Sequence, residues 1–333
     1  MLRSSRRAFV GLGAAIGLGV SALPAIGQEV VLKLGHVLAP THQFHQGMLL
    51  AAEKVAAATN GRVKLEVFPS SQLGTERDMH VALRTGGVDM VLASPGGASV
   101  HLKEVAVLDA PFLFRDDAHW RAVVYGPIGE EWARQMAEKS GVHIMGWFHR
   151  GTRHVISRTK PYETLAAIQG EKIRVADLPP YPQVFAALGA VPTPIAFAEM
   201  YSALQSGIVD GADVPLDTIQ AQKLYEVSKY VNLIAWSYAA PGLILMSNGA
   251  FERVPPADRE VLVAALRVGS DFIADAFING EAEMKKKLEA GGMTLLVPKD
   301  LPAWREAGEK AIPKLAATWG GDAVLYARIH DVR

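Results

Sequence analysis

Strand-like and helix-like segments alternate along this chain. Residues 30–36 form an apolar run typical of a buried strand, and residues 43–59 show the pattern of a helix that ends at Asn60-Gly61. Residues 62–67 alternate polar and apolar side chains, which predicts a half-buried strand. The alternation continues with a helix capped by Thr75 and ending near Gly86, strands over 88–93, 172–175 and 209–213, and helices over 181–188 and 197–205. This order predicts an α/β fold with a parallel-type sheet and crossover helices.

One local pattern occurs twice. Residues 82–89 read ALRTGGVD, and residues 203–210 read ALQSGIVD. In both, a helix would end at a glycine that can adopt the left-handed conformation, and a strand would begin at once with Val-Asp. Coincidence is the alternative, because Ala-Leu followed three residues later by Gly is a common helix ending. The matching strand context favours a repeated unit, so we predict two similar halves.

A long segment near the C-terminus has the composition of a single helix. Residues 257–289 contain no proline and only two glycines, Gly269 and Gly280, and their apolar side chains recur close to the helical period. Pro255-Pro256 precedes the segment and Gly291-Gly292 follows it. At about 1.5 Å per residue, the helix would be about 50 Å long, which exceeds the width of one small domain. We therefore predict that it crosses both domains, unbroken rather than kinked at Gly280.

Length and composition restrict the class of protein. The chain has 333 residues, enough for two domains, with 34 basic and 34 acidic residues. Affinity for phosphate depends on clustered Lys and Arg, so this balance argues against a nucleic-acid partner. The chain contains no cysteine, which excludes disulfides, thiolate metal ligands and cysteine nucleophiles.

The first 27 residues have the layout of an export signal. Arg3, Arg6 and Arg7 precede an apolar, glycine-containing run over 8–20, and the small residues up to Gly27 provide a cleavage site. The paired arginines resemble the twin-arginine motif, whose machinery exports folded proteins; the general secretory route is the alternative. An uncleaved membrane anchor is disfavoured, because the run is shorter than the about 20 residues that span a bilayer. We predict a periplasmic mature protein, cleaved near Gly27.

Motifs of catalytic and cofactor sites are absent from the sequence. It contains no nucleophile elbow, phosphate-binding loop or zinc-binding HExxH helix, so we predict no enzyme activity and no cofactor. His42 and His45 lie three residues apart on a predicted helix and could share a metal ion, but no third ligand lies nearby in sequence. We therefore predict no metal site and interpret these histidines as a solvent-exposed helix start. The lysines at 285–287 are interpreted as a solvated helix face.

Two arginines are candidate ligands for an anion. Arg174 lies within an apolar strand and faces opposite to Ile173 and Val175, because side chains alternate along a strand. A guanidinium in such a place is suited to hold a carboxylate through two parallel hydrogen bonds. On composition alone, an ordinary surface salt bridge is the simpler interpretation of Arg174, and Arg153 is equally ambiguous.

Several sequence runs together resemble the solute-binding subunit of the tripartite ATP-independent periplasmic (TRAP) transporters. They occur in family order over 68–76, 83–90, 110–116, 151–153, 170–175, 192–194, 201–211 and 225–230, and so cover nearly all of the chain after the signal. The resemblance implies a two-domain periplasmic-binding-protein-like α/β fold, in which hinge strands and the long C-terminal helix cross both domains. We accordingly predict domain I over 28–150 and 240–280, and domain II over 151–239 and 281–333.

The resemblance also implies which residues bind the ligand. Arg174 takes the position of the main carboxylate clamp, and Arg153 supplies further charge or hydrogen bonds. Glu76 matches a position that often binds ligand hydroxyls or amines, and Phe197 matches a residue that packs over the ligand. The other residues placed at the ligand are Asp213, Trp236, Ser94, Val37 and Val214.

The implied ligand is a small organic acid, captured as the two domains close and delivered to membrane permease subunits. Val37, Ser94 and Val214 stand where sialic-acid binders of the family carry longer polar or acidic residues. Buried hydroxyls need hydrogen-bond partners, so a highly hydroxylated nine-carbon sugar acid is disfavoured. A hydroxy or oxo monocarboxylate is preferred, with a hexuronate or aldonate as second choice. The rival functions are solute binding for an ATP-driven importer and periplasmic catalysis on a carboxylated substrate.

Overall fold

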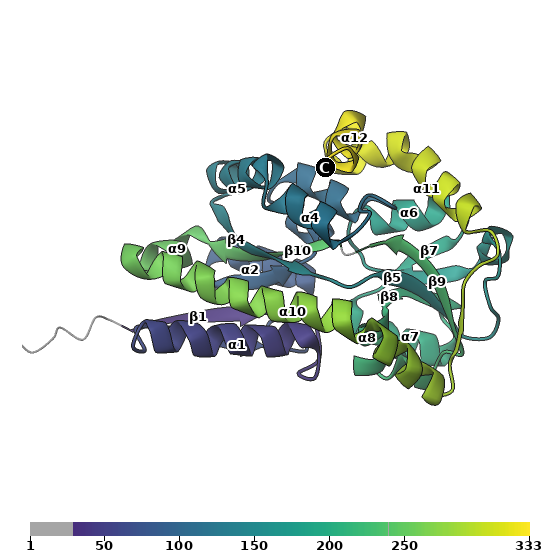
Figure 1. Cartoon of the computed structure of the whole chain (residues 1–333), viewed down its shortest axis with the longest axis horizontal. Coiled ribbons are helices and arrows are strands. Elements are labelled where there is room, and N and C mark those ends of the chain that lie inside the picture. Colours follow the sequence, from purple (N-terminus) through teal and green to yellow (C-terminus); the bar gives the residue numbers. More distant parts are fainter. Residues whose placement is uncertain (1–28, 239) are drawn as a thin grey trace, which may run out of the picture.

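Two β-sheets form the framework of the molecule (Figure 1). The computed structural model describes residues 29–238 and 240–333, so the predicted export signal lies outside the described residues. The first sheet contains β1 (Val30–Gly35), β2 (Val63–Phe68), β3 (Met90–Ala93), β4 (Val142–His149) and β10 (Pro241–Ser247), in the order β2-β1-β3-β10-β4. The second contains β5 (Arg153–Ser157), β6 (Lys172–Val175), β7 (Val191–Pro194), β8 (Gly211–Pro215), β9 (Tyr230–Ser237) and β11 (Thr294–Leu296), in the order β11-β9-β5-β8-β6-β7.

Both sheets are mixed, whereas the sequence predicted a parallel-type sheet. β1 pairs in parallel with β2 and β3, and β6 pairs in parallel with β7 and β8, as expected of strands joined by crossover helices. β10 and β5 run antiparallel to their neighbours on both sides. The cause is the connectivity: β4 passes into β5 through residues 150–152, and the chain returns from β9 into β10. Each sheet thus contains a strand joined directly to the other sheet.

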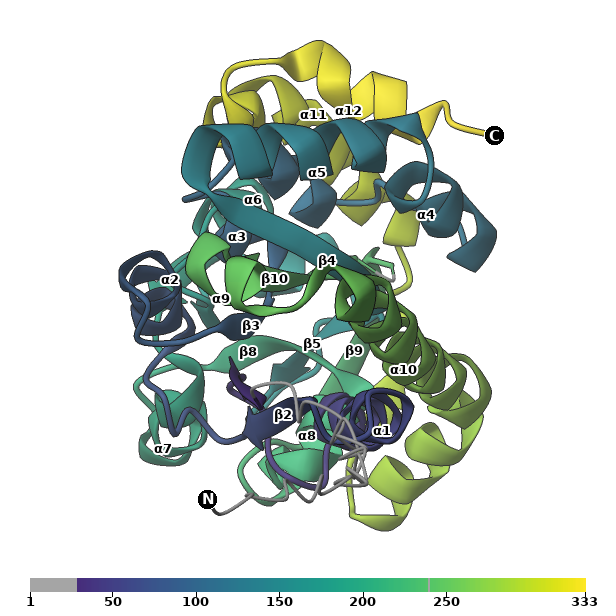
Figure 2. The ribbon, with the colours of Figure 1, turned by 90° about the vertical axis from the view of Figure 1, so that its left-hand side faces the viewer.

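Helices cover both sheets (Figures 1 and 2). Those before β5 are α1 (Gln43–Ala58), α2 (Glu76–Thr85), α3 (Pro95–Ala98), α4 (Asp117–Val124) and α5 (Pro127–Ser140), with the 3₁₀ helix η1 (Lys103–Asp109). Those between β6 and β9 are α6 (Tyr181–Ala187), η3 (Phe197–Glu199), α7 (Met200–Ser206), α8 (Leu216–Ala221) and η4 (Leu224–Glu226). The C-terminal part adds α9 (Asn248–Arg253), α10 (Pro256–Ala290), α11 (Leu301–Leu315), η5 (Ala316–Trp319) and α12 (Ala323–His330). The strands and helices predicted from sequence are present, with ends shifted by one or two residues in most cases.

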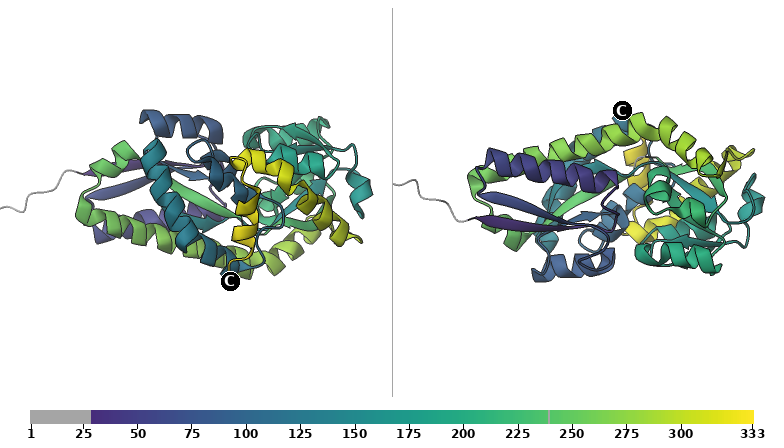
Figure 3. Two further views of the ribbon diagram at one scale, coloured as in Figure 1. Left: turned by 90° about the horizontal axis from the view of Figure 1, so that it is seen from above. Right: turned by 90° about the horizontal axis from the view of Figure 1, so that it is seen from below.

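α10 connects the two sheets. It contains 35 residues, which makes it about 52 Å long, and Gly280 does not end it, as predicted. It packs along α1 beside the first sheet and reaches α8 and β11 at the second (Figures 1 and 3). Gly47 of α1 and Gly269 of α10 permit this close packing, because a Cβ at Gly47 would lie 2.6 Å from the Gly269 carbonyl oxygen. Among the described residues, no helix is long and apolar enough to cross a membrane.

The repeated sequence pattern corresponds to a repeated structure. α2 ends at Gly86 with φ of 79°, and α7 ends at Gly207 with φ of 77°. Asp89 and Asp210 then make the same pair of hydrogen bonds: the carboxylate accepts from a peptide N–H of the neighbouring parallel strand, and the Asp peptide N–H donates to the carbonyl of that residue. The strand residues are Lys33 in β1 and Lys172 in β6. The prediction of two similar units is confirmed for these helix ends and for the hydrogen bonds of the aspartates that follow them.

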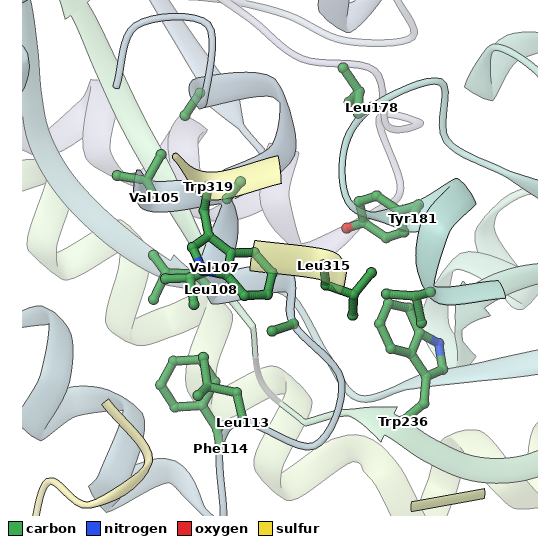
Figure 4. Packing of buried hydrophobic residues seen from close by; sticks show 14 of the residues in the cluster. Val105, Val107, Leu108, Leu113, Phe114, Leu178, Tyr181, Trp236, Leu315 and Trp319 are labelled. Carbon is green, nitrogen blue, oxygen red and sulfur yellow. The ribbon is translucent and has the colours of Figure 1, made fainter. Parts of the chain in front are cut away.

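A hydrophobic cluster extends from the first sheet to the second. It includes Val107 and Leu108 of η1, Tyr181 of α6, Trp236 of β9 and Trp319 of η5 (Figure 4). The C-terminal helices lie over both ends of this cluster: α11 packs on α6 (Figure 2), and η5 packs on η1. The division of the chain into domain I and domain II at the boundaries given above remains a prediction.

Candidate functional site

A cavity of about 310 Å³ is lined by residues from both sheets and from the segments that follow their strands. Parallel strands present their carboxyl ends at one edge, and ligands of open α/β sheets bind at such edges. Eight of the nine residues assigned to the ligand by resemblance line this cavity: Val37, Glu76, Ser94, Arg153, Arg174, Phe197, Asp213 and Val214. Trp236 is the exception. Their direct contact with a ligand remains a prediction.

Arg174 contributes a buried cation to the cavity. Its side chain is 3% exposed, and its Nε and Nη2 both donate to the carbonyl oxygen of Ile195, at 3.0 and 2.8 Å. Among residues 29–238 and 240–333, no carboxylate lies within ion-pair distance of it. Burial lowers the pKa of Arg174 to about 10, so the guanidinium remains charged at neutral pH. The interpretation of Arg174 as a surface salt bridge is therefore wrong.

Arg153, in contrast, already has a carboxylate partner. Its Nε lies 3.0 Å and its Nη2 2.5 Å from Oδ2 of Asp213, and both side chains are buried. Burial alone would lower the pKa of Arg153, but the charge of Asp213, the hydrogen bond to it and the contribution of Tyr181 together outweigh burial and raise the pKa. Trp236 lies behind this pair: its indole donates to Oδ1 of Asp213 at 2.8 Å, and none of its surface is exposed. Trp236 thus orients Asp213, which orients Arg153.

Arg150 is a cavity residue that the sequence analysis did not single out. Its Nη1 donates to Oδ1 of Asp109 at 2.8 Å, and its Nη2 donates to the hydroxyl of Tyr181 at 3.0 Å. The Tyr181 hydroxyl donates to the same Asp109 oxygen at 2.9 Å. Arg150 lies in the segment that joins β4 to β5, so this network links η1, the crossing segment and α6. The sequence signal that could have identified Arg150 is its position three residues before Arg153, in the short segment that crosses from one sheet to the other.

Glu76 and Glu199 are the acidic groups of the cavity lining that have no arginine or lysine partner among the described residues, and Glu76 is the half-buried one, since Glu199 is exposed. Its Oε1 accepts hydrogen bonds from the peptide N–H and the hydroxyl of Ser94, both at 2.6 Å. His80, one turn along α2, places its Nε2 3.8 Å from the same oxygen. Burial would raise the pKa of Glu76, but the contacts to His80 and Ser94 together outweigh it and hold the pKa below its usual value. Glu76 is therefore an ionised acceptor.

The comparisons with known proteins identify the family. The model of the bacterial extracellular solute-binding proteins, family 7, matches residues 34–318. The chain belongs to this family. A solute-binding protein of Verminephrobacter eiseniae is 34% identical over 254 residues, which cover 76% of this chain and 75% of the relative.

Solved structures of TRAP periplasmic solute-binding proteins match the fold as well. That of Polaromonas sp. JS666, bound to D-erythronate, superposes with a TM-score of 0.86 and 30% identity over 92% of this chain and 99% of the other. That of Roseobacter denitrificans, with bound L-galactonate, gives a TM-score of 0.84 and 28% identity over 92% of this chain and 99% of the other. The predicted resemblance to TRAP solute-binding subunits and the two-domain fold are confirmed. This family consists of extracellular solute-binding proteins rather than enzymes.

The structure of this family-7 protein has close contacts across the cavity. Arg77 of α2 pairs with Asp177, which follows β6, at 3.0 Å. His42, at the start of α1, contacts the carboxylate of Asp217 in α8, while its Nδ1 accepts from the Phe44 N–H. These contacts join segments beside the first sheet to segments beside the second.

The prediction of a solvent-exposed helix start at His42 and His45 is therefore wrong. His42 is 1% exposed, and His45 is 8% exposed, with its Nδ1 3.1 Å from Nε2 of His36. The cause is the contact of the α1 start with α8 and with the end of β1, which a sequence pattern does not show. No group of three potential metal ligands occurs in the described part of the chain.

Proposed function

We propose that this TRAP-type solute-binding protein captures a small hydroxy or oxo monocarboxylate in the cavity between its two sheets and delivers it to membrane permease subunits. A sugar acid, such as a hexuronate or aldonate, is the second class of ligand. The proposal includes a periplasmic location after cleavage of the export signal near Gly27. It includes no cofactor and no turnover of the ligand.

The observation that carries the proposal is the unpaired guanidinium of Arg174. An ion removed from water must recover its lost hydration from fixed partners, and the described residues offer Arg174 one acceptor, the carbonyl oxygen of Ile195. A ligand carboxylate would supply the missing anion through charge-assisted hydrogen bonds. The Phe197 ring, 6.0 Å from the guanidinium carbon, lies beside the same place and can pack over the bound acid.

The cavity favours a small and partly apolar acid. Its volume of about 310 Å³ is at the lower end of the range for ligand sites. Apolar side chains supply much of its lining, namely Val37, Leu38, Phe44, Leu92, Phe148, Phe197 and Val214. The ligands of the two matched structures, D-erythronate and L-galactonate, are hydroxylated monocarboxylates of the aldonate type, so they support a monocarboxylate and keep the aldonates as the second class of ligand.

Because residues from both sheets line the cavity, we expect the two domains to close on the bound ligand. A ligand that contacts groups from both sheets gains all of its contacts only in the closed form, so it shifts the population toward closure. The closed form would then be the one that docks on the permease. A solute-binding protein of an ATP-driven importer would share this physics, but the family match favours the TRAP class.

The test is a thermal-shift screen over organic acids, followed by calorimetry on Arg174→Ala. Each charge-assisted hydrogen bond contributes roughly 1.5–3 kcal/mol, so loss of two should weaken binding at least about a hundredfold. The ligand-free variant should unfold at the wild-type temperature or above, because the substitution removes a buried charge that has no acidic partner. Arg134→Ala, on the exposed face of α5, is the matched control and should bind normally.

Two results would end the proposal. One is near-normal affinity of Arg174→Ala for an acid found in the screen. The other is chemical conversion of that acid on prolonged incubation, which would show an enzyme. Recovery of unchanged acid in a one-to-one complex supports the transport function.

A further inference from the structure

Two buried histidines lie behind Glu76, outside the cavity lining. His80 of α2 has its Nε2 3.8 Å from the Glu76 carboxylate, and its Nδ1 lies 3.0 Å from Nε2 of His101. The two rings are 2% and 6% exposed. Within the described residues, His80 Nε2 and His101 Nδ1 have no hydrogen-bond partner. The carboxylate that faces the ligand is thus connected to two titratable groups that the proposed binding step does not use.

The positions of the ring nitrogens define where hydrogens can reside. With both rings neutral, there are two N–H hydrogens: one points from His80 Nε2 toward Glu76, and the other must then join His101 Nε2 to His80 Nδ1. A third hydrogen turns His80 into a cation whose Nε2–H lies beside the Glu76 carboxylate, at 3.8 Å, and whose Nδ1–H donates to His101 Nε2, while the hydrogen of His101 then resides on its Nδ1. Uptake of a proton therefore breaks no contact and replaces a neutral neighbour of Glu76 by a charged one.

The charges of the cavity make such an uptake favourable when an anion arrives. Arg150 is paired with Asp109, and Arg153 is paired with Asp213. Arg77 is paired with Asp177, and Glu199 is exposed to solvent. Among the described residues of the lining, Arg174 and Glu76 are therefore the less exposed charges left to offset each other across the ligand space. A ligand carboxylate bound to Arg174 neutralises that cation, and the Glu76 anion then stays in a closed, poorly hydrated site without compensation. His80 is the neighbouring group that can supply a positive charge.

Few other charged groups lie near enough to His80 and Glu76 to compensate the Glu76 carboxylate. Within α2, the charged groups that act on the histidine pair are Glu76 itself and Arg84. β3, β10 and α3, which pack against α2, contain no titratable side chain. Across the cavity lie Arg150 and Arg174, whose charges act on Glu76. From η1, Asp109 is held by Arg150 and by the Gly96 N–H.

We propose that His80, supported by His101, takes up a proton when the organic acid binds, so that the cavity accepts a ligand carrying one net negative charge. This inference rests on the proposed function and specifies the charge class of its ligand. His80 is a positioning residue, because it acts on the ligand through Glu76. Because ligand binding takes up a proton, binding is stronger at low pH and weaker at high pH. The dissociation constant should rise by up to about tenfold per pH unit once the free protein has lost that proton.

Calorimetry in two buffers measures the proton directly. D-erythronate is titrated at pH 8 in phosphate and in Tris, whose ionisation enthalpies differ, and the difference in heat gives the number of protons bound. We expect uptake of about 0.5–1 proton for the wild type. His80→Gln should bind with no uptake and a flat pH profile, and His101→Gln should show reduced uptake. His330→Gln, at an exposed histidine near the C-terminus, is the control and should behave as wild type.

The outcomes separate this inference from the proposed function. Binding without proton uptake between pH 6 and 9 overturns the inference and leaves the function intact. If no organic acid binds, the function fails, and the histidine coupling is decided without ligand by NMR titration of ¹⁵N-histidine-labelled protein. Glu76→Gln should then lower the titration midpoint of His80, because the anion that stabilises its charged form is gone. An unchanged midpoint overturns the inference in that case as well.

Discussion

Gly96 allows the two halves of the cavity to meet. It lies in α3, and a Cβ built on it would overlap the carbonyl oxygen of Pro179, well inside the 3.0 Å below which real Cβ contacts essentially do not occur. Pro179 belongs to the segment between β6 and α6, so this is a contact across the cavity. In Gly96→Ala, the two segments must separate by roughly 1 Å, or the closed form must carry the strain of overpacking.

The expected loss of affinity follows from that strain. Overpacking costs about 1–3 kcal/mol, and this cost applies to the closed form alone, because opening of the hinge relieves the overlap. The apparent dissociation constant should therefore rise about 5- to 150-fold. The ligand-free variant should unfold near the wild-type temperature, since the peptide N–H of residue 96 still donates to Asp109.

Calorimetry with D-erythronate and small-angle scattering test this reasoning together. The wild type should become more compact when saturated, and Gly96→Ala should do so less. Gly249→Ala, in α9, is the matched control, because a Cβ there meets nothing within 4 Å. Affinity within about twofold of wild type, with equal compaction, would refute the view that closure brings these segments into contact.

Two further predictions concern the buried polar groups. Trp236→Phe keeps an aromatic ring but removes the five-membered ring whose N–H donates to Asp213. We expect a stability loss of about 1.5–3 kcal/mol and weaker binding; unaltered affinity would show that Trp236 acts on core packing alone. For His154, burial lowers the pKa to about 3, so the unfolded chain binds more protons below pH 6.5 and stability is lost as pH falls from there. At pH 5 that loss is about 2 kcal/mol, and urea unfolding of His154→Gln should show a smaller decrease between pH 7 and pH 5 than the wild type; equal decreases would contradict it.

Local patterns in the sequence were sufficient to predict where individual helices begin and end. Thr75 caps α2 with a reciprocal hydrogen-bond pair to Asp78, and Gly86 and Gly207 end their helices in the left-handed conformation. Such features depend on a few neighbouring residues, so they can be read along the chain. The antiparallel strands β5 and β10 could not be predicted in this way, because their partners lie far away in sequence.

The difference between local and long-range contacts also explains how much of the candidate site could be predicted from the sequence. Resemblance located eight residues that line the cavity, but it could not show which of them are already neutralised. That depends on contacts over long sequence separations, such as Arg153 with Asp213 and Arg150 with Asp109, and on Trp236 lying behind Asp213 rather than at the cavity. Only after these pairs are subtracted does Arg174 stand out as the cation that an incoming anion can satisfy. Of the two acids of the lining that have no arginine or lysine partner among the described residues, Glu199 is exposed and Glu76 is half-buried, so a bound acid changes the electrostatic environment of Glu76 and of His80 beside it.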